Sequence, residues 1–275
     1  MEASILAPPP GRRSLMSGLS APECLLVLFI ALGAYVQSIA GFAMAMLAVA
    51  LGSALTDLPL PLVTATTMLC ALVNVVGGLH GQYRHVDWRG WRAMTFMQVP
   101  GVWLGLWLLT WLSRSAELAL QMLLGTFVLG AGVAMMLRPA PQTRRSASAA
   151  FAMIGGSGGV LNGMFAAGGP LAGWFLYRQP LPVERIRATL LAYFLVGSGT
   201  RVLTVAVTGG FDRQVLRMAV FALPATLLFT WLGRAYPPRL GQASTRRVVF
   251  LLLMVSGGLI LASAARDSGI WARLW

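Results

Sequence analysis

The sequence predicts an all-α polytopic membrane protein, and three observations carry that prediction. Hydrophobic residues make up 57% of the 275 residues, charged residues only 11%, and the mean hydropathy is +0.73. A soluble domain carries about 25% charged residues, so a water-soluble chain of this composition would be unable to cover its apolar surface. The apolar residues also gather in eight long runs, and landmarks of the first four runs recur in the last four.

Polar and small residues occupy 1–23, which we expect to be a cytoplasmic N-terminal tail. The apolar runs that follow cover residues 24–56, 60–80, 93–112, 117–137, 149–177, 188–208, 215–233 and 247–265. A helix needs about 20 apolar residues to cross a bilayer, so six of these runs match one crossing each. About eight transmembrane segments are expected, as a first repeat, an inter-repeat loop, a second repeat and a C-terminal tail at 24–138, 139–148, 149–265 and 266–275.

The first and fifth runs are too long for one straight crossing and too short for two. Both contain residues that interrupt helices: Gln37, Ser38 and Gly41 in the first, and Gly155, Gly156, Gly158, Gly159, Gly168, Gly169 and Pro170 in the fifth. A break at membrane depth is tolerated only where protein or a water-filled cavity covers the freed backbone. We therefore expect two tandem four-helix repeats, each opening with a broken or re-entrant helix.

The spacing of charged residues and prolines supports this duplication. The matched landmarks are Pro59, Asp87, Arg92 and Pro100 in the first half, and Pro180, Asp212, Arg217 and Pro224 in the second. Their separations are nearly constant, between 121 and 125 residues, and Gly41 matches Gly168 with a separation of 127. Four crossings per half would give both halves the same orientation, whereas five would make the repeats inverted. The sequence leaves both arrangements open.

The arginines bear on the orientation in the membrane. With four crossings per half and a cytoplasmic N-terminus, 12 arginines fall on the cytoplasmic side and 8 on the other. Because cytoplasmic segments retain positive charge, this count favours cytoplasmic termini.

Arg201 is the residue with the clearest chemical meaning. It lies inside the apolar run 188–208, and no Asp or Glu lies in the apolar centre of any run. An arginine at the bilayer centre costs roughly 2.5–3.5 kcal/mol, and its planar fork matches the geometry of oxyanions. We expect Arg201 to bind a transported anion. The alternative is that it extends to the membrane surface or bonds backbone carbonyls.

Gly168 and Gly169 before Pro170 predict a helix N-terminus inside the membrane. The free N–H groups of such an end suit an anion, although small residues also serve close helix packing. The matching break of the first half and three further polar residues complete the predicted substrate-binding set: Gln37, Ser38, Gly41, Asn74, Asn162 and Ser198.

Other classes of function find no support in the residues. Cys24 and Cys70 have no CxxC or Cys/His spacing, and His80, His85 and Asp87 have no second ligand cluster, so we expect no metal site. No catalytic or nucleotide-binding motif occurs, so neither an enzyme nor a cofactor is expected. The net charge of +13 comes from scattered arginines, which is not the single basic face of a nucleic-acid-binding protein.

The two breaks and the polar loop between them resemble the TauE/SafE family of sulfite exporters. The matching stretches are 38–42, 83–89, 163–170 and 187–190, and the likeness covers about 24–265. This resemblance implies a secondary transporter that exports small anions, such as sulfite or organosulfonates, across the bacterial inner membrane. An uptake permease for another organic anion and a non-transporting scaffold are the alternatives. The oligomeric state is not implied.

Overall fold

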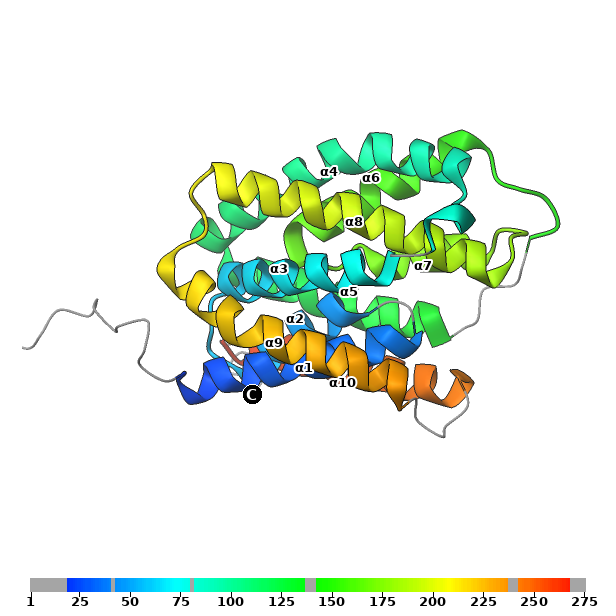
Figure 1. The fold of residues 1–275 in the computed structure, drawn as a ribbon. Coiled ribbons are helices and arrows are strands. Elements are labelled where there is room, and N and C mark those ends of the chain that lie inside the picture. The colour runs from blue at the N-terminus through cyan, green and yellow to red at the C-terminus, as the bar shows by residue number, and fades with distance from the viewer. Residues whose placement is uncertain (1–18, 41–42, 80–81, 137–141, 237–241, 268–275) are drawn as a thin grey trace, which may run out of the picture.

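A computed structural model describes residues 19–40, 43–79, 82–136, 142–236 and 242–267 (Figure 1). Within these ranges the chain is helical and has no strand, so the all-α prediction is confirmed. The elements are α1 (Ala21–Ala40), α2 (Met44–Leu55), α3 (Leu60–Leu79), a 3-10 turn η1 (Tyr83–His85), α4 (Trp88–Ser115), α5 (Glu117–Met136), α6 (Ser148–Phe165), α7 (Gly169–Tyr177), α8 (Val183–Val207), α9 (Arg213–Ala235) and α10 (Gln242–Asp267).

Helices α1 and α10 extend beyond their apolar runs, at the start of α1 and at the end of α10. Helix α1 begins inside the expected tail, because the Glu23 carboxylate accepts hydrogen bonds from the Ser20 backbone N–H at 2.8 Å and from its hydroxyl at 3.0 Å. This local contact resembles a capping box. Helix α10 likewise runs to Asp267, past the expected start of the C-terminal tail.

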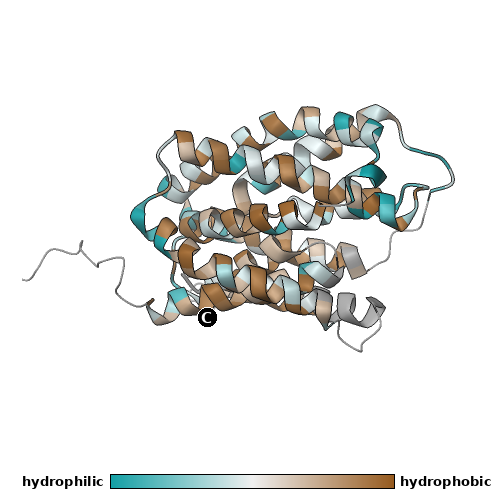
Figure 2. Ribbon diagram, in the orientation of Figure 1, coloured by the Kyte–Doolittle hydropathy of each residue, from teal (hydrophilic) through white to brown (hydrophobic). Residues whose placement is uncertain are grey.

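The surface of the bundle suits a bilayer. Six described helices, α1, α3, α4, α5, α8 and α9, are long and apolar enough to cross a membrane. Figure 2 shows apolar residues along the body of the helices and hydrophilic residues at both ends. Phe96, Trp103, Trp107 and Trp231 are all more than half exposed on the outside, where water would disfavour them and lipid would not.

The first long run is divided into α1 and α2, which fold back on each other. A Cβ on Gly33 of α1 would lie 2.7 Å from the carbonyl oxygen of Met44, at the start of α2. A Cβ on Gly52, late in α2, would lie 3.0 Å from Leu26, early in α1. Early α1 therefore meets late α2, so the two helices form an antiparallel hairpin.

The fifth long run is divided in the same way into α6 and α7. Gly168, before α7, packs against the carbonyl oxygen of Gly158 in α6. Further along the pair, the rings of Phe151 and Phe175 meet edge to face with centroids 4.9 Å apart. These contacts again pair the start of one helix with the end of the other.

Alanine supplies the left-handed backbone at both breaks. Ala43 has a φ of 90° and Ala166 a φ of 57°. The Ala166 N–H donates to the carbonyl of Asn162 at 3.0 Å, which closes the last turn of α6. Gly168 instead has an ordinary φ of −68°, and its lack of a side chain serves close packing. Gly41, predicted at the first break, lies outside the described residues.

The directions of the other helices follow from their contacts. Helices α4 and α6 run parallel, because Gly90 packs on Phe151 at one end and Gly105 on Gly163 further along. Helices α1 and α9 also run parallel, joined by Glu23 and Arg217 near their starts and by packing near their ends. Helices α5 and α10 run antiparallel, since Gly125 contacts Leu261 and Leu129 contacts Gly257.

These directions define two ends of the bundle, which lie left and right in Figure 1. End A holds the starts of α1, α3, α5 and α9 and the ends of α2, α4, α8 and α10. End B holds the starts of α4, α6, α8 and α10 and the ends of α3, α5, α7 and α9. The start of α2, next to Gly33 of α1, and the start of α7, next to Gly158 of α6, lie between these ends.

Candidate functional site

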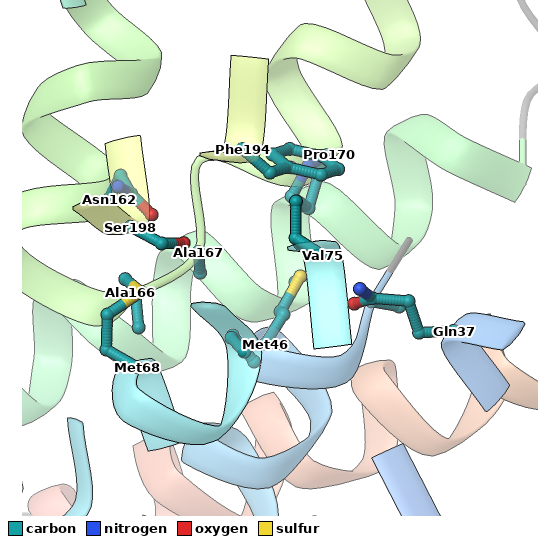
Figure 3. A pocket seen from close by; sticks show the side chains of 14 residues that line it. Gln37, Met46, Met68, Val75, Asn162, Ala166, Ala167, Pro170, Phe194 and Ser198 are labelled. Atoms are coloured by element: carbon teal, nitrogen blue, oxygen red, sulfur yellow. The ribbon is translucent and has the colours of Figure 1, made fainter. Parts of the chain in front are cut away.

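The two breaks meet at a buried cavity (Figure 3). Ala43 and Met46 line it from the first break and α2, and Ala166 and Gly169 from the second break and α7. Further lining residues come from α1, α3, α6 and α8: Gln37, Met68, Ala71, Val75, Asn162, Phe194 and Ser198. The cavity thus joins segments from both halves of the chain.

The cavity is small in this conformation. Its volume is about 40 Å³, measured as the space open to the centre of a water-sized sphere. A single water needs about 10–15 Å³ on that measure, so there is room for a few waters or one compact ion. Met46 and Met68 form part of the wall, and methionine side chains adapt readily to what they enclose.

Three polar side chains, and no charged one, occur among the described residues that line the cavity: Gln37, Asn162 and Ser198. Figure 3 shows Asn162 and Ser198 at one side of the cavity and Gln37 at the other. The Gln37 Oε1 accepts a hydrogen bond from the Met44 N–H at 3.1 Å, which leaves its amide nitrogen for another partner. The Asn162 Nδ2 is buried and has no partner among the described residues.

Two helices begin at the cavity wall. Helix α2 starts at Met44 and α7 at Gly169, with Ala45, Met46 and Pro170 also in the lining. The first N–H groups of a helix have no partner within the helix and carry partial positive charge. Pro170 has no N–H of its own. The cavity wall therefore carries two side-chain amides, a hydroxyl and two positive helix ends, which are groups that suit an anion.

The structure brings together four of the predicted site residues, since Gln37, Asn162, Gly169 and Ser198 all line the cavity. Gly168 lies just outside the lining, against Gly158 and the Cβ of Asn162. These contacts keep the start of α7 close to α6.

Two other predicted residues have partners outside the cavity. Ser38 donates to the carbonyl oxygen of Tyr35 at 2.7 Å and packs against Gly233 on α9. Asn74 is buried, and its amide nitrogen lies 3.1 Å from the sulfur of Met44. Neither residue is part of the lining.

Arg201 is buried within the helical bundle and lies behind the cavity wall. Only 2% of the residue is exposed, and its Nη1 donates to the carbonyl oxygens of Asn162, at 2.7 Å, and Gly163. These carbonyls belong to the last turn of α6, where a positive charge is favourable. The guanidinium thus makes the backbone contacts that were the alternative to direct substrate binding.

Gln98 is a buried polar residue that the sequence analysis did not select. It is fully buried on α4, and its Nε2 donates to the carbonyl oxygen of Tyr193 at 3.1 Å. Gly197 lets this amide and that of Asn162 approach α8, because a Cβ there would lie 2.7 Å from the Asn162 Nδ2 and would contact Gln98 directly. A glutamine inside the apolar run 93–112, two residues before Pro100, was the available signal.

The described residues show no group of three or more His, Cys, Asp or Glu side chains that could hold a metal ion. His80 lies outside the described part of the chain.

Comparison with known proteins shows the family of this chain. The sequence model of the family described as Sulfite exporter TauE/SafE matches residues 25–260. The chain belongs to the TauE/SafE family. The resemblance seen in the sequence is thereby confirmed over most of the chain.

Two relatives of this TauE/SafE protein carry names that describe transport. A protein of Cupriavidus necator, named "Probable sulfite/organosulfonate exporter TauE", is 35% identical over 264 residues, which is 96% of this chain and 98% of the relative. A protein of Comamonas testosteroni, named "Probable inner membrane transporter protein TsaS", is 31% identical over 184 residues, or 65% of this chain and 75% of the relative. No solved structure matches the chain with statistical significance.

The family, the relatives and the apolar helices together identify a multi-pass protein of the bacterial inner membrane. They also place this TauE/SafE member among membrane transporters.

Proposed function

We propose that this protein is a secondary transporter that exports a small anion, either sulfite or an organosulfonate, and that the cavity between the two breaks is its substrate site. The observation that carries this proposal is the donor set of the cavity. Gln37, Asn162 and Ser198 supply polar groups, two helices begin at its wall, and no described lining residue is acidic. A cation would find few acceptors there, whereas an oxyanion finds donors on several sides.

The size of the cavity supports a compact substrate. A volume of about 40 Å³ suits a small oxyanion better than an extended organic acid. A sulfonate with a larger substituent would need Met46 and Met68 to move aside, which methionines do at low cost. We therefore expect flux to fall as the organic group of the substrate grows.

We propose that the two halves are inverted repeats of five helices each, in which α1 to α5 correspond to α6 to α10. Gln37 and Asn162, one from each half, are 125 residues apart, as are the starts of α2 and α7. The parallel pair of α1 with α9 then matches the parallel pair of α6 with α4. Corresponding helices run in opposite directions, which supports the inverted arrangement.

The driving force follows from charge. None of the described lining residues is an Asp or Glu that could carry a proton. A membrane potential that is negative inside favours the exit of an anion by about 2.3 kcal/mol per charge per 100 mV. Export by uniport down this potential is therefore the simplest coupling.

Flux measurements in proteoliposomes test the proposal. Vesicles would be loaded with labelled sulfite, a small alkyl sulfonate or a small carboxylate, and efflux followed at imposed potentials. We expect efflux of sulfite or sulfonate from the wild type and a loss of about ten- to hundredfold in Asn162→Leu, because a hydrogen bond to a charged group contributes about 1.5–3 kcal/mol. Ser38→Ala is the matched control, since Ser38 lies near the break but outside the lining.

Each other outcome has a separate meaning. Sulfite efflux that is unchanged in Asn162→Leu and in Gln37→Leu would contradict the site while keeping the transporter. Flux of the carboxylate alone would favour a permease for another organic anion. No flux of any of the three anions, from protein shown to be folded, would favour the scaffold.

A further inference from the structure

The two ends of the bundle differ sharply in charge. The described segments at end B carry eleven arginines and two acidic residues, within residues 82–92, 142–145, 178–187, 234–236 and 242–247. The described segments at end A carry four arginines and five acidic residues, within 19–23, 56–59, 113–117, 208–217 and 264–267. Arginine is therefore concentrated at the end from which α4, α6 and α8 begin.

Side-chain contacts hold together several of the segments at each end. At end B, Asp87 pairs with Arg145, and its backbone N–H donates to the hydroxyl of Thr189 at 2.9 Å. These contacts join the starts of α4, α6 and α8. At end A, the carboxylate of Glu23 bonds both Gln214, at 3.1 Å, and Arg217, which joins the starts of α1 and α9.

The hairpins decide which loops share an end. Because α2 returns along α1 and α7 returns along α6, each hairpin brings the chain back to the end from which it started. Suppose instead that the chain crossed the membrane once in the run 24–56 and once in the run 149–177. The loop at 82–87 and the segment at 142–147 would still share a side, but the segments at 178–182 and 234–236 would move to the other side. The arginine count then shrinks from a strong bias to a weak one.

We infer that end B faces the cytoplasm and that α1 begins, and α10 ends, on the outer side of the inner membrane. Positively charged residues within short loops and near helix ends set the orientation of a multi-pass protein, while acidic residues contribute little. Eleven arginines against four is a strong bias by that rule. The orientation is opposite to the cytoplasmic tail expected from eight single crossings.

This orientation gives the charges a function in export, a consequence that rests on the proposed function. The basic end B would raise the local concentration of anions on the side from which they leave. End A instead opens into a vestibule of about 700 Å³ next to the end of α2, lined in part by Asp57 and Glu117. Exposed carboxylates there would disfavour the return of an anion.

Labelling of single cysteines in intact cells tests the orientation. Val183 and Thr208 lie at the two ends of α8, both exposed, and thus form a matched pair on one helix. Each would be replaced by cysteine in the full chain with Cys24 and Cys70 changed to serine, and the cells treated with a membrane-impermeant maleimide. We expect Thr208→Cys to react in intact cells, and Val183→Cys only after the inner membrane is permeabilised.

A reporter on the native chain covers the case in which the cysteine-free background fails to fold. Alkaline phosphatase joined after Trp275 should be active, because it would lie in the periplasm, and green fluorescent protein at the same place should be dark. Reaction of Val183→Cys in intact cells, equal reaction of both variants, or an inactive phosphatase fusion would overturn the orientation. Labelling needs no transport, so a failure to detect anion flux would not contradict this orientation. A labelling pattern that contradicts the orientation would likewise leave the proposed anion transport untouched.

Discussion

Arg201 on α8 donates a hydrogen bond of 2.7 Å from Nη1 to the main-chain carbonyl oxygen of Asn162 on α6. The side chain of the same asparagine lines the cavity, so the arginine holds the backbone of a residue that we assign to the substrate site. The last carbonyls of a helix have no partner within the helix, and a positive charge there offsets the negative end of its dipole. Arg201 is therefore a positioning residue for the end of α6.

Replacing Arg201 should affect stability and flux together. In Arg201→Met the Asn162 carbonyl keeps the bond from the Ala166 N–H, but the Gly163 carbonyl loses its buried donor, and an unsatisfied buried polar group costs about 1–3 kcal/mol. We expect a lower midpoint of thermal unfolding in detergent and a reduced flux of every anion that is transported. A variant with wild-type stability whose KM rises for one anion but not another would instead show that the guanidinium contacts the substrate.

Placing a carboxylate in the cavity should block anions without disturbing the break. In Gln37→Glu the oxygen that accepts from the Met44 N–H is retained, so the start of α2 keeps its bond. The new charge would face the substrate in a site of low dielectric, where repulsion between like charges is strong. We expect anion flux to fall by at least about tenfold, equivalent to about 1.4 kcal/mol. Gln121→Glu, in the vestibule at end A, is the control and should retain most of the flux.

The packing of α4 on α6 depends on glycine. A Cβ on Gly105 would lie 2.9 Å from the Cα of Gly163 and closer still to the Val160 carbonyl oxygen, both of which are backbone atoms. Overpacking of this kind costs about 1–3 kcal/mol, so Gly105→Ala should lower the free energy of unfolding by that amount. Gly130→Ala on α5 is the control, because no described atom lies within 4 Å of its Cβ position. That variant should be neutral or more stable by about 0.5–1 kcal/mol.

The ion pair between Glu23 and Arg217 should be visible in the same unfolding measurements. Its side chains are only 3% and 8% exposed, so removing one partner leaves a buried charge without compensation. Glu23→Leu is expected to destabilise the protein by about 3–5 kcal/mol, and adding Arg217→Met should recover part of that loss. Glu184→Gln, at an exposed acidic residue, should change stability by less than about 0.5 kcal/mol. A double variant no more stable than Glu23→Leu would contradict this account.

Sequence alone was enough to predict the class of protein and the break at Gly168–Pro170, but the predicted breakers Gln37 and Ser38 lie within α1, and the glycines between 155 and 159 lie within α6. Apolar runs of about 20 residues can hydrogen-bond their backbone in lipid only as helices, so composition and length suffice for an all-α membrane protein. The start of α7 at Gly169, followed by Pro170, was also readable, because proline favours the first turn of a helix for local reasons. The same holds for the likeness to the family, which rests on short stretches of sequence.

The path of the chain after each break, and the polar groups that meet there, could not be predicted from local sequence. The turn at Ala166 is local, but the return of α7 along α6 depends on contacts such as that between Phe151 and Phe175. Gln37 and Asn162 line the same cavity although they are 125 residues apart in the sequence. Arg201 bonds a main-chain carbonyl because α6 places that carbonyl within its reach. The physical reason is that helix formation follows from neighbouring residues, whereas helix direction and burial of polar groups follow from packing between distant ones.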